Sequence, residues 1–170
     1  MHYVLSDIHG HERRFLDILK QIDLKETDTL FVLGDVIDRH PWGLRILRKL
    51  MSMPNAKLIL GNHEYMMLRA LGHPIDDNLD DGTALPHWYR NGGGVTHRHW
   101  KHLRKSVRKE IIDYLHSLPL NRDIEVDGKR DVYETHDVID NIEKRLETEL
   151  SIEATVHMDP IVTDDEKVDH

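Results

Sequence analysis

Three short polar segments in the first 64 residues carry side chains that could bind metal ions. They span residues 6–10, 34–39 and 61–64, with the sequences SDIHG, GDVIDR and GNHE. Together they supply carboxylate, imidazole and amide groups, and the chain has no cysteine to add a thiolate. Such hard-to-borderline ligands suit Mn, Fe, Zn or Mg, and metals held in this way support hydrolysis. The segments therefore indicate a hydrolytic metal site.

Each polar segment directly follows a short apolar run typical of a β-strand, at residues 3–5, 30–33 and 58–60. Apolar residues at helical spacing come after each segment. They are Phe15, Ile18, Leu19 and Ile22; Leu44, Ile46, Leu47, Leu50 and Met51; and Tyr65, Met66, Leu68 and Leu71. This alternation predicts a βαβαβα arrangement with parallel strands. Because open α/β sheets bind ligands at the carboxyl ends of their strands, we expect the three segments to meet there.

The middle of the chain has fewer signals. Turn-forming residues predict a loop over residues 73–94, partly packed through Trp88 and Tyr89, and Trp42 is expected in the core. A basic helix is predicted over residues 98–117, with an apolar side made by Leu103, Val107, Ile111, Leu115 and Leu118. Its basic face could attract an anionic substrate or simply be solvated.

The bulk composition sets broader limits. At 170 residues the chain makes one domain, or one domain with an appendage. Its net charge of −8 argues against nucleic acid as the main partner. No apolar run approaches the roughly 20 residues of a membrane span, and no signal peptide precedes the first strand. We therefore expect a cytoplasmic protein without a membrane partner.

The three segments, in this order and each at a strand end, resemble the calcineurin-like metallophosphoesterases, specifically the small bacterial type of the phosphoprotein phosphatase branch. That family has the patterns D-x-H, G-D-x-x-D-R and G-N-H-E, and the resemblance covers about residues 1–130. It also includes Trp88 with Asn91-Gly92-Gly93, and residues 127–129. The resemblance implies an α/β fold of the metallophosphoesterase type, an αββα sandwich.

The same resemblance implies two divalent metal ions, with Mn expected and Fe, Zn or Mg possible. Asp7, His9 and Asp35 would hold the first ion. Asp35 would bridge to the second ion, which Asn62 also meets through its amide oxygen. Two adjacent cations lower the pKa of a bridging water and stabilise the attacking and leaving oxygens of a phosphoryl displacement.

Three further residues would carry the catalytic roles. His63 would protonate the leaving group, Asp38 would orient that imidazole and favour its protonated form, and Arg39 would clamp the phosphate. His40 stands where the family usually has glycine, which narrows the approach to Arg39. We expect Glu64 to steady its loop rather than bind metal.

Alternatives are open for several of these residues. Asp7 could be a turn residue, and His9 an exposed loop histidine. Asn62 could cap the third helix, with or without binding metal. His11 is expected to be solvent-exposed.

The family completes its second metal site with two later histidines, one in a V-H-A or V-H-G context and one in a G-H-T context. Neither context occurs here. His136 lies near the first expected place, but its neighbours differ and its register is shifted by about one residue. The sandwich is therefore expected to be truncated, and a homodimer could cover the exposed sheet.

Residues 136–167 resemble instead the end of the cytoplasmic domain of cation diffusion facilitator transporters, with an amphipathic helix and a strand that leads into His157-Met158-Asp159-Pro160. In that reading His157 and Asp159 could bind zinc. We therefore divide the chain into a phosphoesterase-like domain, residues 1–130, and a helix–strand appendage with an acidic tail, residues 131–170.

Two classes of function follow. The first is a metal-dependent phosphoesterase whose substrate is a phosphorylated protein, or a small phosphoester or phosphoanhydride such as a dinucleoside polyphosphate. For this first class, His136 or His157 would have to complete the second metal site. The second class is a metal-binding protein that is catalytically impaired.

Overall fold

A computed structural model of the chain describes residues 1–75 and 82–122. Its strands form one parallel sheet in the order β1-β2-β3. They are β1 (His2–Leu5), β2 (Thr29–Val32) and β3 (Ala56–Leu58). The parallel pairing confirms the prediction from the alternation of apolar runs, and it brings all three carboxyl ends to one edge of the sheet.

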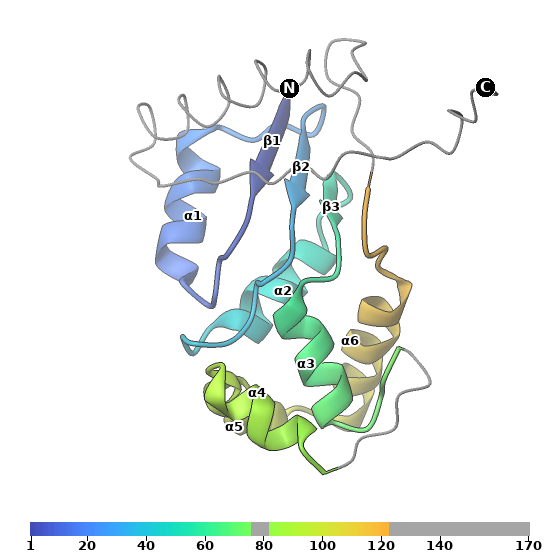
Figure 1. Cartoon of the computed structure of the whole chain (residues 1–170). Coiled ribbons are helices and arrows are strands. Elements are labelled where there is room, and N and C mark those ends of the chain that lie inside the picture. The colour runs from blue at the N-terminus through green and yellow to red at the C-terminus, as the bar shows by residue number, and fades with distance from the viewer. Residues whose placement is uncertain (76–81, 123–170) are drawn as a thin grey trace, which may run out of the picture. The chain divides into compact units, whose positions relative to one another are not determined.

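The described residues contain six helices. They are α1 (Glu12–Gln21), α2 (Gly43–Met51), α3 (Asn62–Ala70), α4 (Ala84–Arg90), α5 (Gly93–His102) and α6 (Lys105–Ser117). The first three connect or follow the strands as predicted. Figure 1 shows α4 and α5 beyond the carboxyl ends of the strands, where α4 contacts α3 and α5 contacts α2. These helices therefore stand close to the three polar segments.

The core forms around the central strand. Leu30 and Val32 of β2 are fully buried, as expected for a strand with neighbours on both edges and helices packed against it. The helices contribute further large side chains that are at most 1 % exposed: Phe15, Ile46, Leu47, Leu50, Met67, Leu68, Trp88, Ile111 and Leu115. This core anchors the strand ends that carry the polar segments.

Two expectations for the middle of the chain are wrong. Residues 84–90 and 93–94 are helical rather than loop, and the single helix expected over 98–117 is two helices. The chain is extended at Leu103 and Arg104, with ψ angles of 146° and 149°. Arg108 donates to the carbonyls of Lys101 and Leu103, at 2.5 and 3.1 Å. These bonds satisfy carbonyls that the end of α5 leaves free, so they stabilise the break.

Trp42 was expected in the core, but it is 46 % exposed. It immediately precedes α2, whose buried side is formed by Leu44, Ile46, Leu47 and Leu50. Instead, the guanidinium carbon of Arg45 lies 5.8 Å from the centre of the Trp42 ring.

Several predictions lie outside the described residues. They are the boundary at 130, the appendage over residues 131–170, and the proposed ligands His136, His157 and Asp159. Within residues 1–75 and 82–122, no helix is long and apolar enough to cross a membrane.

Candidate functional site

Backbone hydrogen bonds hold the first two polar segments together at the edge of the sheet. The amide of His9 donates to the carbonyl of Asp35 at 2.9 Å, and the amide of Gly10 donates to the carbonyl of Val36 at 2.8 Å. The backbone itself therefore fixes how His9 stands relative to Asp35.

The third segment joins the second through the buried carboxylate of Glu64. This carboxylate accepts from the backbone amides of Asp35, Val36 and Ile37 at 2.9, 2.9 and 3.2 Å. Burial and the nearby negative charge of Asp35 raise the pKa of Glu64 to about 6, although the three amide donors oppose the shift. The expectation that Glu64 steadies the loop is confirmed.

Replacing Glu64 with glutamine is expected to destabilise the fold by about 1–3 kcal/mol. One side-chain oxygen can still accept from Val36 and Ile37, but the new amino group then faces the amide donor of Asp35 and leaves it unsatisfied. Urea unfolding measures the change. Glu110→Gln, at an exposed position of α6, is the matched control and should change stability by less than about 0.5 kcal/mol. Equal effects of the two substitutions would contradict the role of Glu64.

Gly34 allows the second and third segments to approach each other closely. It has a φ of +84°, and a Cβ on it would lie 2.3 Å from Cα of Gly61. A side chain at this position would therefore meet both backbone strain and a backbone clash.

We expect Gly34→Ala to lower the free energy of unfolding by about 2–4 kcal/mol, from the left-handed conformation together with overpacking. Gly94→Ala is a matched control, since Gly94 lies in α5 and a Cβ there would have no heavy atom within 4 Å. That control should raise stability by about 0.4–1 kcal/mol. Thermal unfolding of both variants tests the pair, and a neutral Gly34→Ala would show that the close approach is not required.

Backbone strain is concentrated in the first two segments. Among the described residues, the non-glycine residues with positive φ include Asp7 (51°), His9 (43°), Asp35 (53°), Asp38 (72°) and Arg39 (61°). Each such residue costs on the order of 1–3 kcal/mol, and strain of this kind gathers at functional sites. The same five residues were predicted from the sequence as metal ligands or catalytic groups.

A possible metal-binding cluster is formed by His9, Asp35 and His63, whose ligand atoms all lie within 4.8 Å of one another. His9 Nδ1 lies 3.0 Å from the carbonyl of Ile37, which fixes the ring. Its Nε2 atom is buried and has no hydrogen-bond partner among the described residues. A buried imidazole nitrogen held in this way and facing carboxylates fits a metal ligand.

The Asn62 side chain lies directly against the carboxylate of Asp35. In the orientation that satisfies both groups, its amide nitrogen donates to the two carboxylate oxygens of Asp35 at 2.9 and 2.7 Å. Asn62 is therefore held beside the cluster of His9, Asp35 and His63. Asn62 is not the helix cap, because the residue at the cap of α3 is Gly61 and no side chain bonds there.

Asp7 lies beside this cluster but is open to solvent. Its side chain is 66 % exposed, and Oδ1 stands 3.4 Å from Nε2 of His9. Its other oxygen accepts from the hydroxyl of Ser6 at 2.6 Å. Asp7 is thus placed where it can join His9 as a ligand. His9 itself is buried, which rules out the alternative of an exposed loop histidine.

His63 makes a buried pair with Asp38. Nδ1 of His63 and Nε1 of Trp88 each lie 2.8 Å from Oδ2 of Asp38. Burial of the ring opposes its charged form, but the hydrogen bond and negative charge of Asp38 outweigh it and raise the pKa of His63. Since Nδ1 faces Asp38, Nε2 is the nitrogen that can serve chemistry.

Arg39 stands next to that nitrogen. One terminal nitrogen of its guanidinium is 3.4 Å from Nε2 of His63, and its backbone amide donates to the carbonyl of Gly92 at 3.2 Å. The side chain is exposed enough to meet an anion beside the imidazole.

Trp88 and Thr96 are supporting residues that the sequence did not identify as part of the site. Trp88 donates to Asp38, and the hydroxyl of Thr96 accepts from the Asp38 amide at 3.0 Å. Gly93 lies so close to the indole of Trp88 that a Cβ on Gly93 would stand 2.3 Å from Nε1. The motif Trp88…Asn91-Gly92-Gly93 was the available signal, but it did not reveal a contact with Asp38.

Histidine, carboxylate and amide groups at the carboxyl edge of a parallel α/β sheet, beside a paired imidazole and an exposed arginine, define a metallohydrolase type of site. Residues 3–166 match the family model of the calcineurin-like phosphoesterases. The chain belongs to this family.

The curated relatives have a narrower description. The symmetrical bis(5'-nucleosyl)-tetraphosphatase of Legionella pneumophila (strain Lens) is 38 % identical over 101 residues, covering 52 % of this chain and 37 % of the relative. That of Salmonella paratyphi A (strain ATCC 9150 / SARB42) is 37 % identical over 68 residues, covering 39 % and 24 %. The crystal structure of a proposed diadenosine tetraphosphatase has a TM-score of 0.45 at 21 % identity, covering 69 % of this chain and 42 % of that one. The match therefore spans between 24 and 37 % of the length of these curated relatives.

These comparisons revise two expectations. The family match runs through residue 166, so it includes the segment compared with cation diffusion facilitators, and nothing supports that second resemblance. The relatives are dinucleoside tetraphosphatases rather than protein phosphatases, so the phosphoprotein phosphatase type is not supported.

Proposed function

We propose that the protein is a metal-dependent hydrolase of phosphoesters or phosphoanhydrides. The observation that carries this proposal is the cluster of His9, Asp35 and His63. Within it, the buried Nε2 atom of His9 has no hydrogen-bond partner in the part of the chain that the structure describes. Strained backbone at the same residues supports a functional rather than a merely structural role.

Asp7, His9, Asp35 and Asn62 would hold divalent metal ions, of which we expect two, with manganese the first to test. Such ions, when bound, supply positive charge to the phosphoryl oxygens and acidify water for attack. This leaves the protein to position the substrate, to neutralise the remaining charge and to protonate the leaving group.

His63 would deliver that proton from Nε2 to the leaving-group oxygen. The carboxylate of Asp38 at Nδ1 orients the ring and favours its protonated form. Arg39, beside Nε2, would hold a phosphoryl oxygen through charge-assisted hydrogen bonds. Trp88 would act as a positioning residue, because it holds the Asp38 carboxylate rather than the substrate.

For the substrate, we favour a dinucleoside polyphosphate over a phosphoprotein, since the relatives are named for tetraphosphate hydrolysis. Incubation of the full chain with diadenosine tetraphosphate and manganese, followed by chromatography, tests this directly. Symmetrical cleavage should give adenosine diphosphate as the sole nucleotide product. Faster turnover of a phosphoserine peptide than of the tetraphosphate would reverse the choice of substrate.

The second candidate is a metal-binding protein with little catalysis. The reason to keep it is that the described residues bring together one histidine–carboxylate cluster, while the further ligands considered, His136 and His157, lie outside them. One bound metal per chain without turnover would favour this reading. The possible homodimer is still a prediction.

A further inference from the structure

A hollow of about 560 Å³ opens beside the candidate site. It lies between the start of α1 and the loop that leads into α2, and its walls include Gly10 and His40. Gly10 directly follows the metal-ligand candidate His9, and His40 directly follows Arg39. Residues that line the hollow are therefore direct chain neighbours of two residues of the candidate site.

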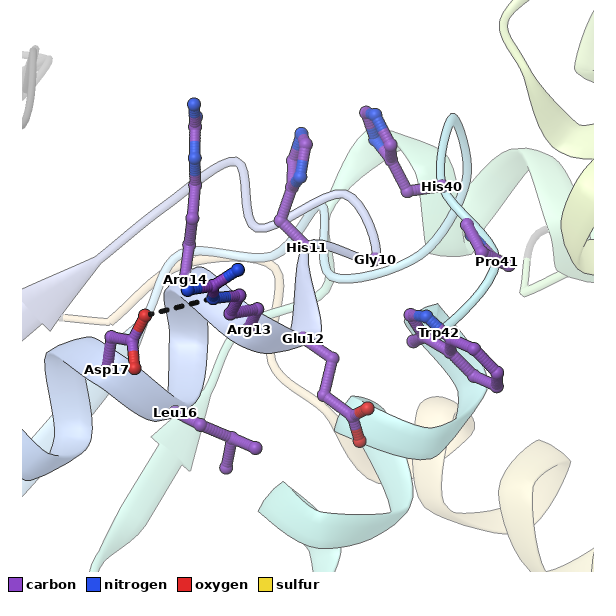
Figure 2. A pocket seen from close by; sticks show the side chains of 10 residues that line it. All are labelled: Gly10, His11, Glu12, Arg13, Arg14, Leu16, Asp17, His40, Pro41 and Trp42. Atoms are coloured by element: carbon purple, nitrogen blue, oxygen red, sulfur yellow. Dashed lines mark ion pairs between the residues drawn. The ribbon is translucent and has the colours of Figure 1, made fainter.

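This hollow is also lined by two large apolar side chains that are exposed. Leu16 is 41 % exposed and Trp42 is 46 % exposed. Figure 2 shows that Leu16 comes from α1 and Trp42 from the segment before α2, with Glu12 drawn between them. An exposed indole and an exposed leucine in the walls of one hollow suit a flat, partly apolar ligand.

The rest of the hollow is polar, and it contains both arginines, Arg13 and Arg14, and carboxylates, Glu12 and Asp17. His11 and His40 have ring centres 3.5 Å apart, and Figure 2 shows both rings and the side chain of Arg14 extending to the same side. Nδ1 of His40 lies 3.1 Å from the carbonyl of His9, which anchors that ring. The carboxylate of Glu12 is compensated by Arg45 at 2.9 Å. The hollow thus offers ring faces, hydrogen-bonding nitrogens and a cation.

From these features we propose that the hollow is a nucleobase subsite, in which Trp42 stacks on a base whose phosphate is held at Arg39. This rests on the proposed function, and it gives that function a means of selecting nucleotides over simple phosphates. The volume of the hollow is in the range of pockets that bind small molecules. A base also matches both parts of the hollow, since its flat face suits Trp42 and its polar edge suits the histidines.

Trp42 is a convenient reporter, because the other two tryptophans, Trp88 and Trp100, are only 0 and 6 % exposed. The full chain, in buffer with a metal chelator, would be titrated with adenosine monophosphate and with ribose 5-phosphate. We expect saturable quenching of tryptophan fluorescence by the nucleotide and none by the sugar phosphate. Calorimetry should then show that Trp42→Ala weakens binding of the nucleotide roughly 5- to 150-fold, the usual value of one base stack.

Trp42→Phe should restore most of the affinity, since it keeps an aromatic face. Tyr89→Ala removes an aromatic residue of similar exposure, 45 %, outside the hollow and should leave binding unchanged. In hydrolysis, Trp42→Ala should lower the ratio of kcat/KM for diadenosine tetraphosphate to that for tripolyphosphate.

Equal binding of nucleotide and sugar phosphate, or unchanged nucleotide binding by Trp42→Ala, would overturn the subsite even if the enzyme is active. An inactive wild-type chain that still binds the nucleotide through Trp42 would instead contradict the proposed function and uphold the subsite.

Discussion

Replacing Asp35 with asparagine is expected to reduce manganese-dependent hydrolysis of p-nitrophenyl phosphate by at least about 100-fold. The loss of groups that merely support a metal ligand costs about 10- to 100-fold, so the loss of a ligand charge should cost more. In the wild-type chain, the backbone amide of His63 donates to Oδ1 of Asp35 at 3.0 Å. The side-chain oxygen of asparagine can still accept this hydrogen bond. The variant should therefore fold, and circular dichroism with initial-rate kinetics would show the effect on chemistry alone.

Asp113→Asn is the matched control for this change. Asp113 is an exposed carboxylate on α6, paired with Lys109, and its replacement should alter the rate by less than about twofold. A folded Asp35→Asn variant that keeps more than a tenth of the wild-type rate at saturating manganese would contradict the assignment of Asp35 as a ligand.

His63→Gln should slow hydrolysis by an amount that depends on the leaving group. For an alkyl phosphate the loss should be about 100- to 10,000-fold, the usual contribution of a general acid. For 2,4-dinitrophenyl phosphate the loss should be much smaller, because that leaving group departs as a stable anion without a proton. Comparing the two substrates under single-turnover conditions separates proton donation from a general disturbance of the site.

His116→Gln serves as the control, since His116 is exposed and its ring contacts the carbonyl of His73 away from the polar segments. It should affect neither substrate. An equal loss of activity toward both substrates in His63→Gln would instead indicate that His63 is needed to hold the metal, as its place in the cluster with His9 and Asp35 also allows.

The sequence was sufficient to predict the sheet and the meeting of the polar segments. The apolar runs and helical spacings are local signals, and parallel strands then bring Asp7, Asp35 and Asn62 to one edge without further information. The sequence also predicted that Glu64 steadies its loop. It did not predict the three backbone amides that donate to Glu64, because these contacts depend on the close approach of two loops.

The surroundings of Asp38 could not be predicted from local patterns. Trp88 and Thr96 lie 50 and 58 residues further along the chain, and their contacts with Asp38 exist only in the folded state. Residues 84–90 are helical despite the turn formers around them, and this helix buries Ala84 and Trp88. Trp42 was misassigned to the core because an apolar residue next to a helix usually packs inward, whereas here α2 turns Leu44 and Leu47 inward and leaves the indole exposed.

The most direct test is to measure the metal bound to the full chain by elemental analysis after reconstitution with manganese, alongside hydrolysis of p-nitrophenyl phosphate. We expect about two metal ions per chain in an active protein, with both occupancy and turnover reduced by Asp35→Asn. A correctly folded wild-type chain that retains no manganese and shows no turnover would contradict the claim that the three polar segments form a hydrolytic metal site.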